Sequence, residues 1–221
     1  MGSQKFGVDP DSTFHLANTV KEIINQSIQL AIVISGGNIF RGLKRSGAGM
    51  ARTPADHIGM PATMINGIAL QQAFEKVGCE SRVMSAIACD VMAESYNWKN
   101  ALTYLARGLV LIFVGGSGSP CFTTDTAAAL RALKVHAEVV MKATKVDGIY
   151  DKDPFKYSDA VKFEKISYAD VQEKQLEVMD ATAIALCREN KIPIPVFNVF
   201  ENGALMKAVT GQKIGTLVED V

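Results

Sequence analysis

Short apolar runs alternate with longer segments in which apolar residues recur every three or four positions along most of the chain. The clearest runs lie at 30–34 and 109–114, and their β-branched residues favour buried strands. The segments between the runs have the periodicity of amphipathic helices that pack one face against a sheet. Strands that alternate with helices in this way are typical of an α/β protein with a largely parallel sheet.

Capping residues and helix breakers set the expected bounds of these elements. Helices are expected at 11–25, 54–77, 91–96, 101–107, 126–133, 168–173, 180–189 and 204–209. Strands are expected at 30–34, 81–85, 109–114, 138–141, 193–197 and 216–218. Asp11-Ser12 and Ser167 are expected to cap helices, Pro61 to interrupt one, and the charged segment 155–165 to form a hairpin or an irregular excursion.

Two of the predicted strands run directly into glycine-rich loops. The strand at 30–34 is followed by Ser35-Gly36-Gly37-Asn38, and the strand at 109–114 by Gly115-Gly116 and the segment 117–124. Backbone N–H groups in such loops approach anions closely, and the threonines of the second loop add hydroxyl donors. Because the carboxyl ends of parallel strands meet at one edge of a sheet, both loops should lie together. The pattern predicts a site for a nucleotide or a phosphorylated metabolite, with an ordinary strand–turn–helix connection as the alternative.

The side chains around these loops fit the needs of phosphoryl transfer. Such a site requires donors for phosphate oxygens, cations that neutralise charge, and an acid that organises them. The candidate backbone donors are Gly36, Gly37 and Gly118, and the candidate cations are Arg41 and Lys142. The candidate acid is Asp125, at a helix N-cap position. Three further residues are suited to contact a nucleoside: Thr144, Tyr150 and Asp153. The chain has neither a G-x-x-x-x-G-K-[ST] nor a G-x-G-x-x-G motif, which excludes Walker-type ATPases and dinucleotide oxidoreductases by motif.

Composition narrows the function classes further. The chain has 221 residues, and its 23 Lys plus Arg are balanced by 23 Asp plus Glu, which argues against a protein that coats nucleic acid. Its four cysteines form no C-x-x-C pair, so we expect free thiols in a reducing cytoplasm rather than a zinc site. No apolar run approaches the ~20 residues of a membrane span, so a soluble, cytoplasmic protein is expected.

Four motifs in order resemble those of the bacterial UMP kinases, which have the amino-acid-kinase fold. They are 35–42 (SGGNIFRG), 55–60 (ADHIGM), 118–125 (GSPCFTTD) and 142–148 (KATKVDG), with further matches at 178–180, 196–198 and 215–217. The resemblance spans the chain from about Phe6 to Val218. It implies a three-layer α/β/α sandwich with a largely parallel central sheet. It also implies a single domain over 1–221, with UMP bound by the part at about 1–135 and ATP by the part at about 136–221.

The resemblance implies that the protein transfers phosphate from ATP to UMP, with Mg²⁺, in pyrimidine nucleotide biosynthesis. For UMP it implies contacts from Gly36, Asp56, Ser117, Gly118, Ser119, Pro120, Cys121, Phe122, Thr123 and Thr124. For ATP it implies contacts from Gly37, Arg41, Thr144, Tyr150 and Asp153, and for catalysis Asp125, Arg41 and Lys142. It assigns no metal ligand among the residues. The implied assembly is a homohexamer that GTP activates and UTP inhibits, with no nucleic acid or membrane as partner.

Departures from the family pattern leave other functions open. The family begins with a strand and a K-x-S-G-E motif whose lysine binds the transferred phosphate, so this chain is expected to start ~20 residues late. Ser35, Ser119 and Pro195 replace a glycine, an asparagine and an arginine that are common there. The first alternative is therefore a catalytically inactive homologue that binds UMP or UTP for regulation. A kinase of an acyl group, such as acetylglutamate or carbamate, is a second alternative, which Asp56 and the loop at 118–125 disfavour. The preference for UMP over CMP rests on the resemblance alone.

Overall fold

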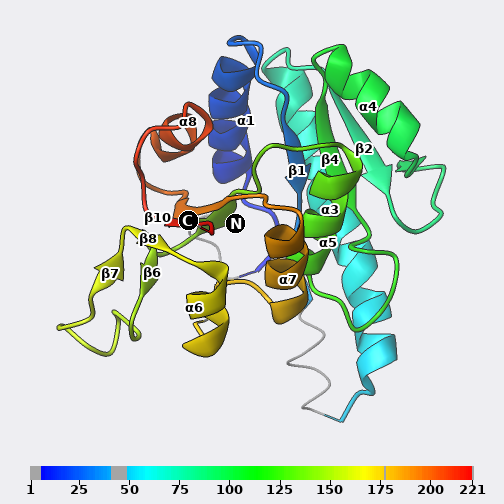
Figure 1. Ribbon diagram of the computed structural model, residues 1–221. Helices are drawn as coiled ribbons and strands as arrows, with labels where there is room; N and C mark the ends of the chain where they lie inside the picture. The colour runs from blue at the N-terminus through cyan, green and yellow to red at the C-terminus, as the bar shows by residue number, and fades with distance from the viewer. Residues whose placement is uncertain (1–5, 41–48, 177, 221) are drawn as a thin grey trace. The chain divides into compact units, whose positions relative to one another are not determined.

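The structure is a computed structural model that describes residues 6–40, 49–176 and 178–220 (Figure 1). The chain folds as two compact units, residues 1–127 and 128–221. Each unit has its own sheet, and the predicted α/β class is confirmed. The assignment of UMP to the N-terminal part and of ATP to the C-terminal part stays a prediction.

The first unit is built on a four-stranded parallel sheet with the strand order β1-β4-β2-β3. The strands are β1 (Ala31–Val33), β4 (Val110–Val114), β2 (Ser81–Ser85) and β3 (Glu94–Ser95). Ile112 of β4 lies opposite both Ile32 of β1 and Val83 of β2. Because β1 and β4 are parallel neighbours, the two glycine loops leave the sheet side by side at its carboxyl edge, as the sequence predicts.

Helices cover the sheet of the first unit (Figure 1). They are α1 (Pro10–Ile24), α3 (Arg52–Lys76), α4 (Trp98–Ala106) and the first turn of α5 (Thr124–Lys134). Helix α1 packs on α3, and α3 packs on β2 and β4. A Cβ atom at Gly67 of α3 would lie 2.4 Å from the Val114 side chain, so only glycine permits this close approach of the helix to the sheet. Side chains alternate along a strand, so Phe113 faces the other side, where its ring meets Tyr96 edge-on.

The second unit contains a four-stranded sheet and a two-stranded hairpin. The sheet has the order β5-β9-β10-β8, and only the pairing between β9 and β10 is antiparallel. Its strands are β5 (Lys142–Thr144), β9 (Ile194–Asn198), β10 (Thr216–Val218) and β8 (Lys165–Ile166). The hairpin pairs β6 (Ile149–Tyr150) with β7 (Lys162–Phe163), so only its second strand lies in the segment 155–165, where a hairpin or an irregular excursion is expected. The helices of the second unit are the rest of α5, α6 (Tyr168–Glu173), α7 (Ala181–Glu189) and α8 (Ala204–Val209).

The predicted helix caps are partly confirmed. Ser167 caps α6 through its hydroxyl, as expected, and Asp180 caps α7. Helix α1, however, is capped by Asp9, whose carboxylate accepts hydrogen bonds from the N–H groups of Asp11 and Ser12. Pro10 follows this cap at the first helical position, where a residue without an N–H group costs the helix nothing.

Three predictions of secondary structure are wrong. The segment 91–96 is not a helix, because Val91 is 98% exposed and gives a helix no buried face, while Glu94 and Ser95 pair with β2. The strand expected at 138–141 lies at Lys142–Thr144, since pairing with β9 begins opposite Val196. Pro61 lies within α3 without ending it. The packing of this helix on the sheet and on α1 outweighs the hydrogen bond that a proline removes.

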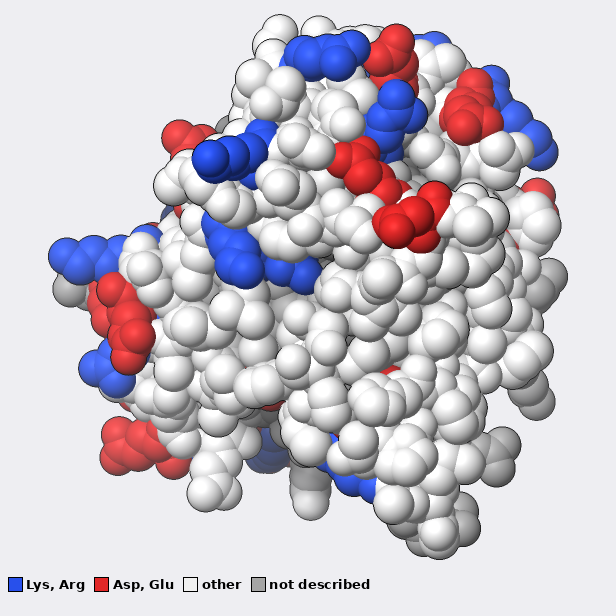
Figure 2. All heavy atoms as spheres, turned by 90° about the vertical axis from the view of Figure 1, so that its right-hand side faces the viewer, with Lys and Arg blue, Asp and Glu red and all other residues white. Residues whose placement is uncertain are grey.

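The balanced charge of the chain is also mixed on the surface. On the face drawn in Figure 2, Lys and Arg side chains lie among Asp and Glu side chains, and neither sign dominates a large area. Among the residues that the structure describes, no helix combines the length and apolar character needed to cross a bilayer.

Candidate functional site

A pocket of about 410 Å³ lies at the carboxyl edge of the β1–β4 pair, within the first unit. Its volume is in the range of small-molecule sites. It is lined by the first glycine loop, the N-terminal half of α3 and the second glycine loop. The lining residues are Ser35, Gly36, Gly37, Phe40, Arg52, Asp56, Gly59, Met60, Thr63, Gly116, Ser117, Ser119, Phe122, Thr123 and Thr124.

Asp56 ties helix α3 to the second glycine loop. Its Oδ2 atom accepts a hydrogen bond from Nε of Arg52 at 2.6 Å and another from the backbone N–H of Cys121 at 2.8 Å. The Asp56 side chain is 14% exposed, so these contacts are partly shielded from water. Arg52 is a site residue that sequence reasoning missed. Its spacing of four residues from an acidic residue on the same helix was the available signal.

Gly36 lets the first loop lie directly on α3. A Cβ atom at this position would be 2.7 Å from Cβ of Ala62 and 3.0 Å from the carbonyl oxygen of Gly59. Real side chains do not tolerate such a contact without a shift of the backbone. The loop therefore needs glycine here because of this contact with α3.

The second loop is shaped by three glycines in the left-handed region, Gly115, Gly116 and Gly118. Gly115 has a φ of 76° and Gly118 a φ of 85°, which other residues adopt only with strain. A Cβ atom at Gly118 would also lie 2.9 Å from the carbonyl oxygen of Ala86, just after β2. Strand order thus sets the path of this loop, since β2 is the neighbour of β4.

Most residues predicted for UMP lie at the pocket. Gly36, Asp56, Ser117, Ser119, Phe122, Thr123 and Thr124 line it, and Gly37, predicted for ATP, lines it too. Gly118, Pro120 and Cys121 belong to the same loop but are not lining residues. Asp125 is not the N-cap of α5. It lies in the first turn, and its N–H group donates to the hydroxyl of Thr123 at 3.1 Å. Arg41 lies outside the described residues.

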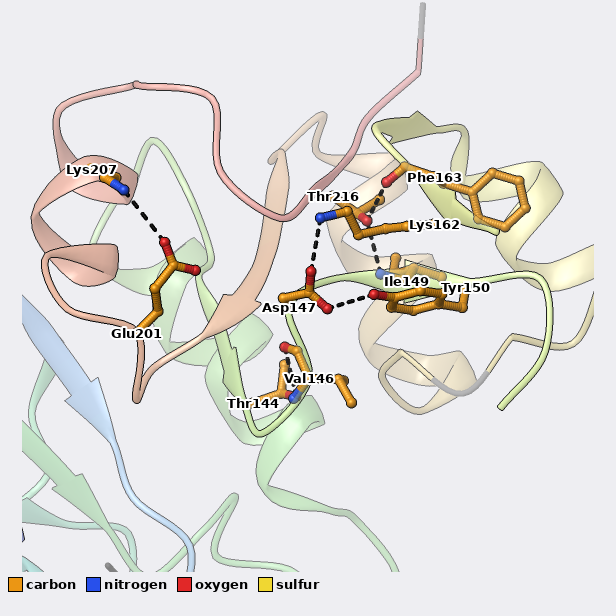
Figure 3. Close-up of polar contacts among 10 residues, drawn as sticks. All are labelled: Thr144, Val146, Asp147, Ile149, Tyr150, Lys162, Phe163, Glu201, Lys207 and Thr216. Carbon is orange, nitrogen blue, oxygen red and sulfur yellow. Dashed lines mark hydrogen bonds and ion pairs between the residues drawn. The ribbon is translucent and has the colours of Figure 1, made fainter. Parts of the chain in front are cut away.

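Of the other residues predicted for ATP, Thr144 lies in β5 and Tyr150 in the hairpin of the second unit (Figure 3), and Asp153 follows β6 in the chain. The Tyr150 hydroxyl donates to Oδ1 of Asp147 at 2.6 Å, and Nζ of Lys162 donates to Oδ2 at 2.9 Å. The hydrogen bond from Tyr150, and then the contact with Lys162, lower the pKa of Asp147, while the same bond raises the pKa of Tyr150. Sequence reasoning missed both Asp147 and Lys162. Together they fix the position of the Tyr150 ring.

The other residues predicted for ATP shape the adjoining turns. Thr144 accepts the N–H of Val146 on its hydroxyl at 2.9 Å, which starts the turn after β5. Thr216 accepts the N–H of Ile149 at 2.8 Å and joins β10 to the hairpin (Figure 3). Asp153 accepts the N–H of Phe155 at 2.9 Å, and this bond lowers the pKa of its carboxyl. Lys142 begins β5.

No ready-made metal centre is present in the described part of the chain, where no three His, Cys, Asp or Glu side chains gather to hold an ion. Mg²⁺ commonly binds through substrate phosphates and only one or two carboxylates. The side chains are thus compatible with a magnesium ion that arrives with a nucleotide.

The four free cysteines differ in exposure, which predicts their reactivity. Burial raises the pKa of Cys187 to about 11 and also raises that of Cys79, whereas Cys121 is exposed beside the pocket. Because the thiolate is the reactive form, iodoacetamide at about pH 8 should modify Cys121 first and the two buried thiols only after unfolding. Peptide mass spectrometry with and without urea measures this order. Equal rates for Cys187 and Cys121 in the folded protein would contradict the structure.

Comparisons with known proteins agree with this geometry. The family model described as the amino acid kinase family matches residues 2–198. The uridylate kinase of Protochlamydia amoebophila (strain UWE25) is 53% identical over 223 residues, which cover 100% of this chain and 88% of that protein. The crystal structure of UMP kinase from Bacillus anthracis matches with a TM-score of 0.94 at 34% identity, over 99% of this chain and 91% of that one. The UMP kinase from Ureaplasma parvum matches with a TM-score of 0.90 at 36% identity, over 96% and 91%.

The family match covers most of this chain, the curated relative covers all of it, and the solved UMP kinase from Bacillus anthracis has the same fold over 99% of it. The glycine loops and Asp56 lie within the matched residues. The chain therefore belongs to the amino acid kinase family and, within it, to the uridylate kinases.

Proposed function

We propose that this protein transfers the γ-phosphoryl group of ATP to UMP and forms UDP and ADP. The observation that carries the proposal is the pocket of the first unit, in which Asp56 of α3 is bonded to the loop at 117–124. The 53% identity to a uridylate kinase over the full chain supports the same reaction.

UMP is proposed to bind in this pocket. The loop from Ser117 to Thr124 holds the base and the phosphate with backbone N–H groups and hydroxyls, and Gly36 adds a close backbone contact. Asp56 accepts hydrogen bonds from the ribose hydroxyls. A carboxylate suits this role because bonds to a charged acceptor are stronger than bonds between neutral groups.

Gly37, Arg41, Thr144, Tyr150 and Asp153 are proposed to bind ATP, which brings Mg²⁺ on its phosphates. An oxygen of the UMP phosphate attacks the γ-phosphorus, and the bond from that phosphorus to the oxygen shared with the β-phosphate breaks. This oxygen needs no strong base, because a phosphate monoester with a second pKa of about 6 is largely ionised at neutral pH. Arg41 and Lys142 neutralise charge on the transferred group, and Asp125 orients these cations.

The biological setting is proposed on the family resemblance. The reaction belongs to pyrimidine nucleotide biosynthesis, and the protein works as a cytoplasmic homohexamer under control by GTP and UTP. Four free cysteines fit a reducing compartment.

The test is a steady-state assay of phosphoryl transfer from Mg·ATP to UMP by the purified chain, with CMP at the same concentrations as the control acceptor. We expect UDP formation that saturates with UMP and a much lower kcat/KM with CMP. A folded chain that binds UMP but forms no UDP would contradict the proposal and identify a binding protein instead. Circular dichroism and UMP binding by calorimetry separate that outcome from misfolding.

A further inference from the structure

Two buried polar side chains on α3 lie one helical turn apart and contact different glycine loops. Thr63 is 6% exposed and Asn66 is 5% exposed. Buried polar groups are rare because each unmade hydrogen bond is costly, so their partners show what they hold in place. Neither residue was recognised from the sequence.

Thr63 is bonded to the start of the second loop. Its hydroxyl oxygen accepts the backbone N–H of Gly115 at 2.7 Å and donates to the carbonyl oxygen of Met60 at 2.7 Å. Because the bond to Met60 lies within α3, it orients the Thr63 hydroxyl, and the second bond then fixes Gly115 relative to the helix. This glycine is the first residue after β4, and the loop toward 117–124 begins there.

Asn66 is bonded to the first loop. Its amide nitrogen donates to the carbonyl oxygen of Ser35 at 2.7 Å and to Oδ1 of Asn38 at 2.6 Å, and its oxygen accepts from the Asn38 amide at 3.0 Å. The Asn38 amide also donates to the carbonyl oxygen of Gly7 at 2.6 Å. Both N–H groups and the oxygen of Asn66 are therefore used, and the bonded loop residues, Ser35 and Asn38, bracket Gly36 and Gly37.

We propose that Thr63 and Asn66 are positioning residues that set the two glycine loops from one helix. The inference rests on the proposed function, because it takes these loops to hold the substrates. Helix α3 is suited to the role, since Gly67 packs directly against Val114 and thereby fixes the helix on the sheet. The same stretch of α3 also lines the pocket with Gly59, Met60 and Thr63 itself, whose hydroxyl is engaged by Gly115 and Met60.

The two residues should have different kinetic signatures. Thr63 holds only the second loop, whose residues are proposed to bind UMP. Asn66 holds the first loop, in which Gly36 is proposed to bind UMP and Gly37 is proposed to bind ATP. Loss of the Thr63 hydroxyl should therefore raise the KM for UMP alone, whereas loss of the Asn66 amide should raise both KM values. A general loss of stability would not change the KM for UMP while leaving the KM for ATP unchanged.

The kinetic experiment compares Thr63→Val, Thr63→Ser, Asn66→Leu and Asn38→Ala, assayed well below their melting temperatures. We expect Thr63→Val to raise the KM for UMP about 10-fold, as the loss of one buried hydrogen bond implies, with the KM for ATP within about 2-fold. Thr63→Ser keeps the hydroxyl and should behave as the wild type does. Asn66→Leu should raise the KM values for both UMP and ATP. If the Asn66→Leu protein does not fold, Asn38→Ala replaces it, because this substitution also removes the hydrogen bonds between Asn38 and Asn66. Ser81→Ala is the control, because Ser81 is also buried in this unit and does not line the pocket, and its hydroxyl has no hydrogen-bond partner among the described residues.

Amide hydrogen exchange tests the positioning role without relying on turnover. Thr63→Val should speed exchange at 115–118 and leave 35–38 unchanged, and Asn66→Leu should do the reverse. Equal exchange changes at both loops in each variant, or melting temperatures that fall while both KM values stay at wild-type levels, would overturn the inference. A wild-type chain that forms no UDP but shows the divided exchange pattern would contradict the proposed function and leave the positioning role supported.

Discussion

Replacement of Asp56 by alanine is expected to raise the KM for UMP by about 10- to 100-fold and to leave the KM for ATP nearly unchanged. The carboxylate accepts the N–H of Cys121 at 2.8 Å and Nε of Arg52 at 2.6 Å, and it lines the pocket. A hydrogen bond to a charged group contributes about 1.5–3 kcal/mol, and each 1.4 kcal/mol is about a factor of ten in binding. The variant loses both the proposed ribose acceptor and the bond that holds the loop at 117–124.

The Asp56 variant has a matched control in the second unit. Asp170 of α6 forms an ion pair with Lys174, the residue that caps the C-terminus of this helix, with 3.1 Å between the two charged atoms. Asp170 has no proposed role in the reaction. Asp170→Ala should leave both KM values at the wild-type level. An Asp56→Ala enzyme with wild-type KM for UMP would remove Asp56 from the binding site. Arg52→Gln adds a second check, since it keeps the carboxylate and should weaken UMP binding less than Asp56→Ala does.

Replacement of Gly36 by alanine is expected to lower kcat/KM for UMP by about 100-fold, the loss that a misplacement of about 1 Å in a site causes. The added methyl group would lie 2.7 Å from Cβ of Ala62, so the loop or the helix must move. Overpacking of this kind also lowers the free energy of unfolding by about 1–3 kcal/mol. Steady-state kinetics and urea unfolding of the same preparations measure both effects.

A second substitution tests whether the contact with α3 is the cause. Ala62→Gly removes the nearest atom and leaves neighbours at 3.0 Å, so Gly36→Ala with Ala62→Gly should recover at least about 10-fold in kcat/KM over Gly36→Ala. Ala62→Gly alone should keep wild-type activity, although glycine within a helix costs about 1 kcal/mol of stability. A double variant as inactive as Gly36→Ala would show that the methyl group acts by some other contact.

The strongly periodic parts of the fold were predictable from the sequence. The strands β2 and β4, the cap Ser167 and helix α8 lie where their patterns predict them. The weak elements were not predictable. The pairing of Glu94 with Met84 and the register of Lys142 opposite Val196 depend on strands distant in sequence, and local propensity carries no information about them.

The candidate site was also predictable only in part. The sequence by itself determined that two strands end in glycine loops and that the chain is an α/β protein, because these follow from local patterns. That Asp56 belongs with the loop at 117–124 was implied by the family resemblance, and the structure joins the two through the N–H of Cys121. Only the tertiary structure decided the roles of Thr63 and Asn66. Their loop partners lie on other segments, and a threonine or asparagine on a helix looks the same in sequence whether it faces water or holds a loop. Packing against the sheet excludes water from these side chains, and their bonds to the backbone then fix the loops.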